Sequence, residues 1–526
     1  MKKGFRQSMA WLHTWTGLLL GWLLFAIFLT GTVAYFRSEL TYWMRPELHG
    51  SGAGPDPAGQ ALAQLAEIAP QAASWAVTLP DERSPVLALS WTDPGAGQAG
   101  GRAVANVAHI DAATGALLHP RETAGGNFLY RFHFELYGLH RTVARWIVGI
   151  ATMAMFVAII SGVITHKKIF KEFFTFRPRK GQRSWLDMHN MTGVLALPYH
   201  VMITFSGLVL FAATLMPLVA QGLGPRAPRP AAEASVAFPP APPPLASIAP
   251  LIARPEAAWS MLVGRILIEK RDLGTPEIVL VPQRNSVVTV HGGSGSNGVE
   301  RMRFDGRDGR LIEATGRPAA SAVTRFGNAL GSLHRARFAD TGLRWLFFVA
   351  GLAGTVMTGS GLLLWVSKRA AKHARADRYP FGLRLVQRLN VGGIAGLALA
   401  TAGYLWANRL IPAQLPDRPQ AEIAAFFSIW LLATLWGFLR PPQESWGAQL
   451  GLTAALLLGL PLLGAATGPV SLPQAIWQGD WVLASVELTA LFCGLLCAIA
   501  ALQLRSDPCR KAGSGAIRLA KTGAEG

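Results

Sequence analysis

Long runs of apolar residues, separated by short polar loops, dominate this chain. A helix that crosses a bilayer needs about 20 mostly apolar residues, and eight runs approach or exceed that length. The first run follows Lys2, Lys3 and Arg6, as a signal peptide would, but it is too long and lacks a small-x-small cleavage site, so we expect an uncleaved anchor. The pattern predicts spans near residues 11–36, 143–165, 188–219, 341–366, 391–411, 423–440, 449–469 and 481–503.

Two long polar segments, 37–142 and 220–340, interrupt the first four spans and carry the patterns of folded domains. Each is predicted to be a small α+β unit, because helix-like spacing and strand-like stretches follow one another in both. The last four spans lack such inserts and are predicted to form an appended transmembrane domain, 391–526, ending in a tail. The predicted helices are 58–68 and 245–258, and the predicted strands are 104–110, 116–118, 278–281, 287–290 and a strand–turn–strand at 303–311.

Composition supports the membrane assignment. Hydrophobic residues make up 51% of the chain and charged residues 15%, with a mean hydropathy of +0.30, which is too apolar for an ordinary soluble protein. The net charge of +19 is concentrated in short loops between apolar runs, which argues against nucleic-acid binding. The most basic loops, 166–187 and 367–390, should face the cytoplasm together with both termini. The inserts would then lie in the periplasm, outside a bacterial inner membrane.

Histidines recur in a repeated pattern. His13 begins a run that reaches Gly17, and His189 begins a similar run that reaches Gly193. The partner helices repeat as well, and a duplicated unit with imidazoles at its membrane edges indicates a symmetric metal or cofactor site. Four further matches link the two units: Thr30-Gly31 with Ser206-Gly207, Ser161-Gly162 with Ser360-Gly361, Arg131-Phe132 to His140 with Arg325-Phe326 to His334, and Arg145-Trp146 with Arg344-Trp345.

Several of these stretches resemble the PepSY-associated transmembrane family, which includes iron-regulated membrane proteins and ferric-siderophore reductases. The match covers roughly residues 1–370, and the turn at 111–115 is the clearest mark of a PepSY domain. The second insert departs from that pattern at 305–309. The segments carrying the resemblance are Phe132-His-Phe-Glu-Leu136, Ser161-Gly-Val-Ile-Thr-His-Lys-Lys168, Phe173-Phe-Thr-Phe-Arg-Pro178, Arg183-Ser-Trp-Leu-Asp-Met-His-Asn190, Leu197-Pro-Tyr-His-Val-Met-Ile-Thr204 and Leu333-His334.

The resemblance implies a four-helix core that binds b-type haems on both sides of the membrane and passes electrons outward to a ferric siderophore. A b-type haem needs imidazoles from two helices on opposite faces of its iron, and polar residues within a membrane tend to be functional. We expect haem b, two per chain. The candidate ligands are His13, His166 and His189 on the cytoplasmic side, and His133, His200 and His334 on the periplasmic side, with His140 as the alternative to His133.

His200 is a prominent candidate because it lies well inside a span. On one straight helix, His189 and His200 would share a face and lie about 16 Å apart, which suits one ligand for each of two stacked haems. The remaining histidines are predicted to lie on the surface of soluble segments: His49, His109, His119, His291 and His373.

Four arginines at the outer ends of spans allow two interpretations: pairing with haem propionates or interfacial snorkelling. The Gly and Ser pairs within spans indicate close helix packing or room for a flat ring. The arginines are Arg141, Arg145, Arg335 and Arg344.

The sequence thus predicts an inner-membrane oxidoreductase that moves electrons from an unidentified cytoplasmic or membrane donor to a periplasmic ferric siderophore or similar iron chelate. No Gly-x-Gly-x-x-Gly before a helix and no Cys-x-x-Cys-His is found, so flavin, nicotinamide and covalent haem are not expected on this chain. The main alternative is a non-redox anchor whose PepSY inserts bind or regulate a periplasmic partner. Transport is disfavoured, because the two units share one orientation and midplane carboxylates are lacking.

Overall fold

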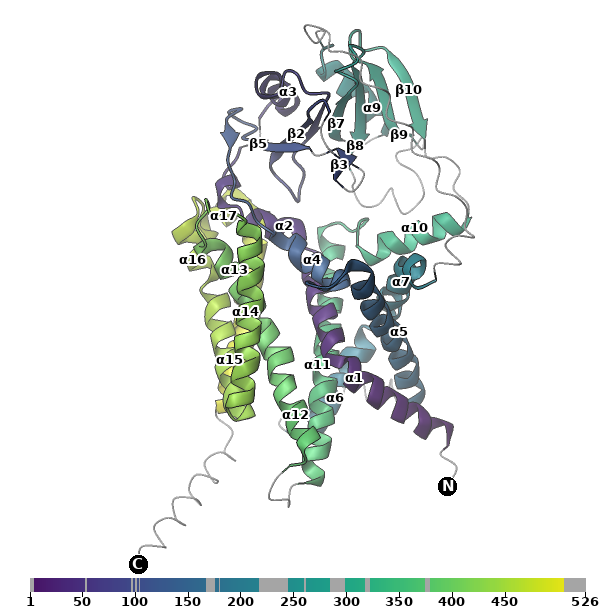
Figure 1. The fold of residues 1–526 in the computed structure, drawn as a ribbon, viewed down its shortest axis with the longest axis vertical. Coiled ribbons are helices and arrows are strands. Elements are labelled where there is room, and N and C mark those ends of the chain that lie inside the picture. Colours follow the sequence, from purple (N-terminus) through teal and green to yellow (C-terminus); the bar gives the residue numbers. More distant parts are fainter. Residues whose placement is uncertain are drawn as a thin grey trace, which may run out of the picture.

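The computed structural model describes residues 4–52, 54–95, 98–99, 102–103, 105–166, 176–178, 180–216, 245–259, 262–283, 299–316, 322–373 and 379–505. A sheet domain lies at one end of a set of long helices (Figure 1). We call that end of the helices the sheet side and the opposite end the far side. The predicted strand at 287–290 lies outside the described residues.

The described α-helices range from seven to 32 residues in length. Apart from the short η1 (Pro46–Leu48) and the π-helical η2 (Val391–Gly396), all are α-helices. They are α1 (Phe5–Ala34), α2 (Arg37–Trp43), α3 (Pro57–Ile68), α4 (Gly125–Glu135), α5 (Arg141–Thr165), α6 (Gln182–Leu195), α7 (Leu197–Leu215), α9 (Ala249–Trp259), α10 (Ala322–His334), α11 (Thr341–Lys372), α12 (Phe381–Asn390), α13 (Leu397–Leu410), α14 (Arg418–Leu439), α15 (Pro442–Leu458), α16 (Leu460–Thr467), α17 (Leu472–Gln478) and α18 (Trp481–Arg505).

The prediction of a polytopic helical membrane protein with sheet-containing inserts is confirmed. Within the described part of the chain, six helices are long and apolar enough to cross a membrane, and eight spans result if each of two bent pairs counts as one. The bent pairs are α6 with α7, at 69°, and α15 with α16, at 40°. The eight predicted spans therefore correspond to these six helices and two bent pairs.

The two inserts share one sheet, although the sequence predicted two separate small units. Eight strands follow the order β10-β9-β8-β7-β1-β2-β5-β6, and β1 of the first insert pairs antiparallel with β7 of the second. Joining the edges of two short sheets satisfies backbone groups that each would otherwise leave unpaired. The strands are β1 (Ser74–Thr78), β2 (Leu87–Thr92), β3 (Gln98–Ala99), β4 (Arg102–Ala103), β5 (Asn106–Ile110), β6 (Leu117–Leu118), β7 (Val263–Glu269), β8 (Glu277–Pro282), β9 (Val299–Asp305) and β10 (Leu311–Gly316).

One face of this sheet carries the core of the sheet domain. Leu65 of α3 and Leu251 of α9 pack with Val77, Leu89 and Ile266 in one buried cluster. The two helices therefore cover the same face, and the alternation of buried and less buried residues along the strands reflects that one-sided packing.

The turn at 305–309, whose sequence departs from the family pattern, has the same geometry as the turn at 111–115. In the first insert, the amide of Gly115 donates to the carbonyl of Asp111 at 2.8 Å, and in the second Gly309 does the same to Asp305 at 3.0 Å. Both glycines have positive φ, at +74° and +73°, which favours glycine. The different sequence at 305–309 thus forms the same turn.

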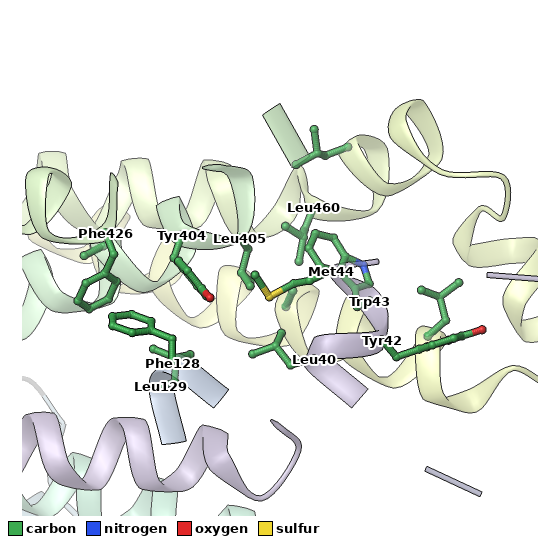
Figure 2. Close-up of a cluster of buried hydrophobic side chains, with 14 of the residues drawn as sticks. Leu40, Tyr42, Trp43, Met44, Phe128, Leu129, Tyr404, Leu405, Phe426 and Leu460 are labelled. Carbon is green, nitrogen blue, oxygen red and sulfur yellow. The ribbon is translucent and has the colours of Figure 1, made fainter. Parts of the chain in front are cut away.

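The appended helices α13 to α18 pack against α2 and α4 of the first repeat. Figure 2 shows the apolar cluster that joins them, in which Trp43 and Phe128 meet Tyr404, Phe426 and Leu460 from the appended domain. Within this interface, Arg418 and Glu422 form an ion pair in which both side chains are fully buried. The ion pair lies within α14, and its two members bind the first repeat: Glu422 accepts from Thr123, and Arg418 donates to the carbonyl of Glu122.

Candidate functional site

Two histidines from different helices face each other near the far side. His13 lies in the third turn of α1 and His189 in the middle of α6, and their ring centroids are 6.0 Å apart. Nδ1 of His13 lies 2.8 Å from the carbonyl oxygen of Ala158 on α5, and Nδ1 of His189 lies 2.8 Å from that of Met357 on α11. Four helices thus contribute to the position of this pair.

A second histidine pair lies near the sheet side, on the short helices that precede α5 and α11. The ring centroids of His133 on α4 and His334 on α10 are 6.2 Å apart. Nδ1 of His133 lies 2.7 Å from the carbonyl oxygen of Ile27 on α1, and Nδ1 of His334 lies 2.9 Å from Oγ of Ser206 on α7. Figure 1 places α4 and α10 beside the ends of the long helices that lie nearest the sheet.

The hydrogen bonds at Nδ1 assign the tautomer of all four rings. A carbonyl oxygen only accepts, so Nδ1 of His13, His133 and His189 must donate. The hydroxyl of Ser206 donates to the carbonyl of Met202 at 2.6 Å, so it accepts from Nδ1 of His334. Each neutral ring therefore keeps its lone pair at Nε2, and such bonds typically orient histidines that ligate metals.

Four glycines make room for these four rings. A Cβ at Gly31 would lie 2.6 Å from ring atoms of His133, and one at Gly207 would lie 3.2 Å from Cε1 of His334. Gly162 and Gly361 have the same relation to the far-side pair, with Cβ positions 3.2 Å from His13 and 3.1 Å from His189. The Gly and Ser pairs noted in the sequence therefore accommodate imidazole rings at equivalent positions of the two repeats.

The spacing of each pair fits an iron held between two imidazoles. Metal–nitrogen distances of about 2 Å on both sides put the ring centroids roughly 6 Å apart, close to the 6.0 and 6.2 Å found. A direct nitrogen–nitrogen hydrogen bond would bring the centroids to about 5 Å. Among the described residues, no group of three or more histidine, cysteine, aspartate or glutamate side chains could hold a metal ion. The donor set therefore suits a cofactor that supplies its own equatorial ligands, as haem does.

Two of the predicted candidates lie apart from these pairs. His166 follows the last turn of α5, where Asn190, the neighbour of His189, donates to its Nε2 at 3.0 Å. His140 is exposed at the N-terminal boundary of α5. The structure thus brings His133, rather than His140, opposite His334.

His200 belongs to neither pair, and the straight-helix argument that related it to His189 is wrong. Pro198 is disfavoured inside a continuous helix, and the chain bends by 69° between α6 and α7, where Ala196 leaves helical geometry. The ring of His200 is 1% exposed and packs against that of Phe28. Both ring nitrogens are buried without a hydrogen bond among the described residues, although the carbonyls of Gly193 and Ala350 are nearby.

The four arginines proposed as propionate partners all have protein partners. Arg141 and Arg145 bind Glu135 at 2.7 and 2.6 Å. Arg335 donates to the carbonyl of Gly331, and the buried Arg344 donates to that of Ala339. These contacts account for their positions, whether or not a propionate joins them.

Sequence reasoning missed the tyrosine pair beside the sheet-side site. The hydroxyl oxygens of Tyr35 on α1 and Tyr199 on α7 are 3.0 Å apart, and that of Tyr35 also reaches the carbonyl of His334. Neither tyrosine belongs to the repeated pattern. The one available signal was a tyrosine at the end of one predicted span and another within a second span, which many membrane helices share.

Comparison with known proteins gives two findings. Residues 10–368 match the PepSY-associated TM region family. An uncharacterized protein of Pseudomonas aeruginosa is 27% identical over 380 residues, which cover 69% of this chain and 92% of the relative. The family match ends before α12 begins at Phe381, so both histidine pairs lie inside the matched region and the appended helices lie outside it.

Proposed function

The chain belongs to the PepSY-associated TM region family, and we propose that it is a two-haem membrane oxidoreductase that passes electrons across the bilayer to an iron chelate. The observation that carries this proposal is the geometry of the two histidine pairs, one towards each end of the helices, at 6.0 and 6.2 Å. When bound, haem b supplies reversible one-electron chemistry at iron. His13 with His189 and His133 with His334 are the residues that would hold it.

The protein's contribution is to keep the imidazoles neutral and in place. Each Nδ1 donates to a carbonyl or hydroxyl on another helix, which fixes the ring and raises the basicity of Nε2. The apolar helices around the rings exclude water and so influence the reduction potential. Rings held in this way need no rearrangement when the redox state changes, which favours electron transfer.

The charge distribution supports a periplasmic location of the sheet domain. Lys368, Arg369 and Lys372 end α11 on the far side, and positive charge of this kind favours the cytoplasmic face. The sheet domain then lies in the periplasm of a bacterial inner membrane, with the acceptor on that side. The family resemblance points to a ferric siderophore or similar chelate, whose hard oxygen ligands hold ferrous iron more weakly, so that reduction releases the metal.

The electron donor must be another molecule, because the sequence has no nucleotide-binding motif for a flavin or nicotinamide. A cytoplasmic protein or a reduced carrier in the membrane would supply one electron at a time to the far-side pair. In this proposal the inserts lie beside the acceptor, while the long helices carry the cofactors.

Absorption spectra of the purified protein, before and after dithionite, test the proposal when combined with a pyridine haemochrome count. We expect sharp reduced bands and two haems per chain. His189→Ala and His334→Ala should each retain one haem, while His140→Ala, at an exposed position, should retain both. Reoxidation of the reduced protein by ferric chelates then tests the activity.

A colourless wild-type protein, still colourless after expression with added haem, would contradict the redox proposal. It would favour the alternative of a membrane anchor whose PepSY domain binds or regulates a periplasmic partner. Equal haem loss in His140→Ala and His334→Ala would contradict the assignment of the sheet-side pair.

A further inference from the structure

A cavity of about 240 Å³ lies between α4 of the first repeat and α14 of the appended domain. Three aromatic rings line it, together with charged and amide groups near its opening. An engineered apolar cavity of about 150 Å³ takes up benzene, so this one is large enough for a substituted aromatic ring. The lining residues that matter here are Phe128, Arg131, Phe132, Glu135, Tyr137 and Gln420.

The cavity lies on the face of α4 opposite the histidine. Phe128, Arg131, Phe132 and Glu135 recur at helical spacing and form one face of α4, whereas His133 is turned by about 100° from Phe132 and farther from the other three. One helix diameter, about 10 Å, therefore separates a molecule in the cavity from the sheet-side histidine pair.

The charges around the opening favour an anion. Glu135 binds Arg131 at 3.1 Å, Arg141 at 2.7 Å and Arg145 at 2.6 Å, so three cations surround one carboxylate. Arg131 is 71% exposed at its side chain and can turn towards an anionic oxygen.

Comparison of the two repeats shows how the appended domain changes the exposure of equivalent residues. Arg325 and Phe326 on α10 correspond to Arg131 and Phe132 on α4, yet Phe326 is 57% exposed while Phe132 is 7% exposed. Helix α14 covers Phe132, whose ring meets that of Phe426 at 5.9 Å, and Phe128 also packs against Phe426 (Figure 2). The cavity therefore depends on helices outside the family match.

We propose that this cavity binds the aromatic ring of an anionic, aryl-oxygen ferric chelate, and that the appended domain thereby selects the acceptor. The inference rests on the proposed function, since the reductant would be the haem that His133 and His334 would hold. One electron passes to the chelated ferric iron, which becomes ferrous, and no bond to carbon forms or breaks. The ring enters the cavity while the iron stays at its opening, near Arg131.

Binding of redox-inert gallium chelates tests this site without any electron transfer. Gallium complexes of N,N′-bis(2-hydroxybenzyl)ethylenediamine-N,N′-diacetate and of ethylenediaminetetraacetate carry the same charge, but only the first presents aromatic rings. Titration calorimetry of the full chain in lipid nanodiscs should show at least tenfold tighter binding of the aryl chelate. Arg131→Gln and Tyr137→Leu should each weaken it about tenfold.

Arg325→Gln is the matched control, because it removes the equivalent arginine from α10, which does not line this cavity, and it should bind the aryl chelate like the wild type. Equal binding of both chelates, or equal losses in Arg131→Gln and Arg325→Gln, would overturn the proposal. Binding in detergent that disappears in nanodiscs would also overturn it, since a lipid headgroup would then occupy the cavity. The haem spectrum of the same samples separates these outcomes from a failure of the proposed function.

Discussion

Gly31 on α1 lies directly against the ring of His133 on α4, so that a Cβ at residue 31 would come within 2.6 Å of ring atoms. The same relation recurs at Gly207, Gly162 and Gly361, one glycine for each paired histidine. The two histidine sites therefore require the absence of a side chain at these four glycines as well as the imidazoles themselves.

Substitution of Gly31 tests this directly. A Cβ 2.6 Å from another side chain forces that side chain to move, so Gly31→Ala should displace His133 and reduce the haem content from two to about one per chain. Gly17→Ala is the control in the same helix, because nothing lies within 4 Å of a Cβ at that position. If both variants keep two haems, Gly31 has no role in positioning the ring.

His200 provides a test of the ligand assignment. Its counterpart in the first repeat is Leu24, which is also buried, so His200→Leu should fit the fold. We expect two haems with unchanged spectra and an unfolding temperature at least equal to the wild type, because a buried polar group without a partner costs about 1–3 kcal/mol. Loss of one haem would instead identify His200 as a ligand, as the sequence suggested.

The buried ion pair between Arg418 and Glu422 should stabilise the appended domain. Glu422→Gln keeps the shape of the side chain but removes the charge, which leaves the fully buried Arg418 without its counterion. We expect destabilisation on the order of 3 kcal/mol, measured as a lower unfolding temperature in detergent. The exposed Glu444→Gln, on α15 of the same domain, is the control and should change the unfolding temperature little.

Acid should destabilise the protein through His49. The sequence predicted a surface residue, which is wrong: His49 is 7% exposed, and burial is the main cause that lowers its pKa to about 4. The unfolded chain, with a pKa near 6.5, binds the proton first as pH falls. Stability should therefore hold above about pH 6.5, decrease between about 6.5 and 4, and level off below.

The contribution of His49 should approach about 3 kcal/mol at pH 4. His49→Gln should flatten the dependence of unfolding free energy on pH within that window, while burial of His109, whose pKa is also lowered to about 4, leaves a residual slope. The free energy of unfolding is measured by chemical denaturation at several pH values. If its dependence on pH is the same in His49→Gln as in the wild type, His49 is not the titrating group.

The histidine repeat could be recognised in the sequence, and it predicted part of the site's arrangement. Equal spacing of His13 and His189 from later Thr-Gly and Ser-Gly pairs predicted equivalent sites, and the structure places a glycine of those pairs or of their partner helices against every paired ring. The break between α6 and α7 could also have been anticipated, since Pro198 is disfavoured inside a continuous helix. The bend angle of 69° between α6 and α7, which separates His189 from His200, could not have been predicted from the sequence.

The joining of the two inserts into one sheet had no local signal. Strand β1 and strand β7 are more than a hundred residues apart in the chain, and neither was among the strands predicted from the sequence. Their pairing depends on which edges the membrane helices bring together. Likewise, the packing of α14 on α4 combines two apolar surfaces that could each have faced lipid.

By itself, the sequence determined the eight predicted membrane spans and the positions of histidines along them. The physical reason is local: in a bilayer, every backbone amide must bond within its own segment, so apolar length alone specifies a helix. Only the tertiary structure decided which imidazoles face each other, because the groups that orient His13, His133 and His189 are backbone carbonyls of other helices. Every residue carries a carbonyl, so no side-chain pattern could have singled out these three.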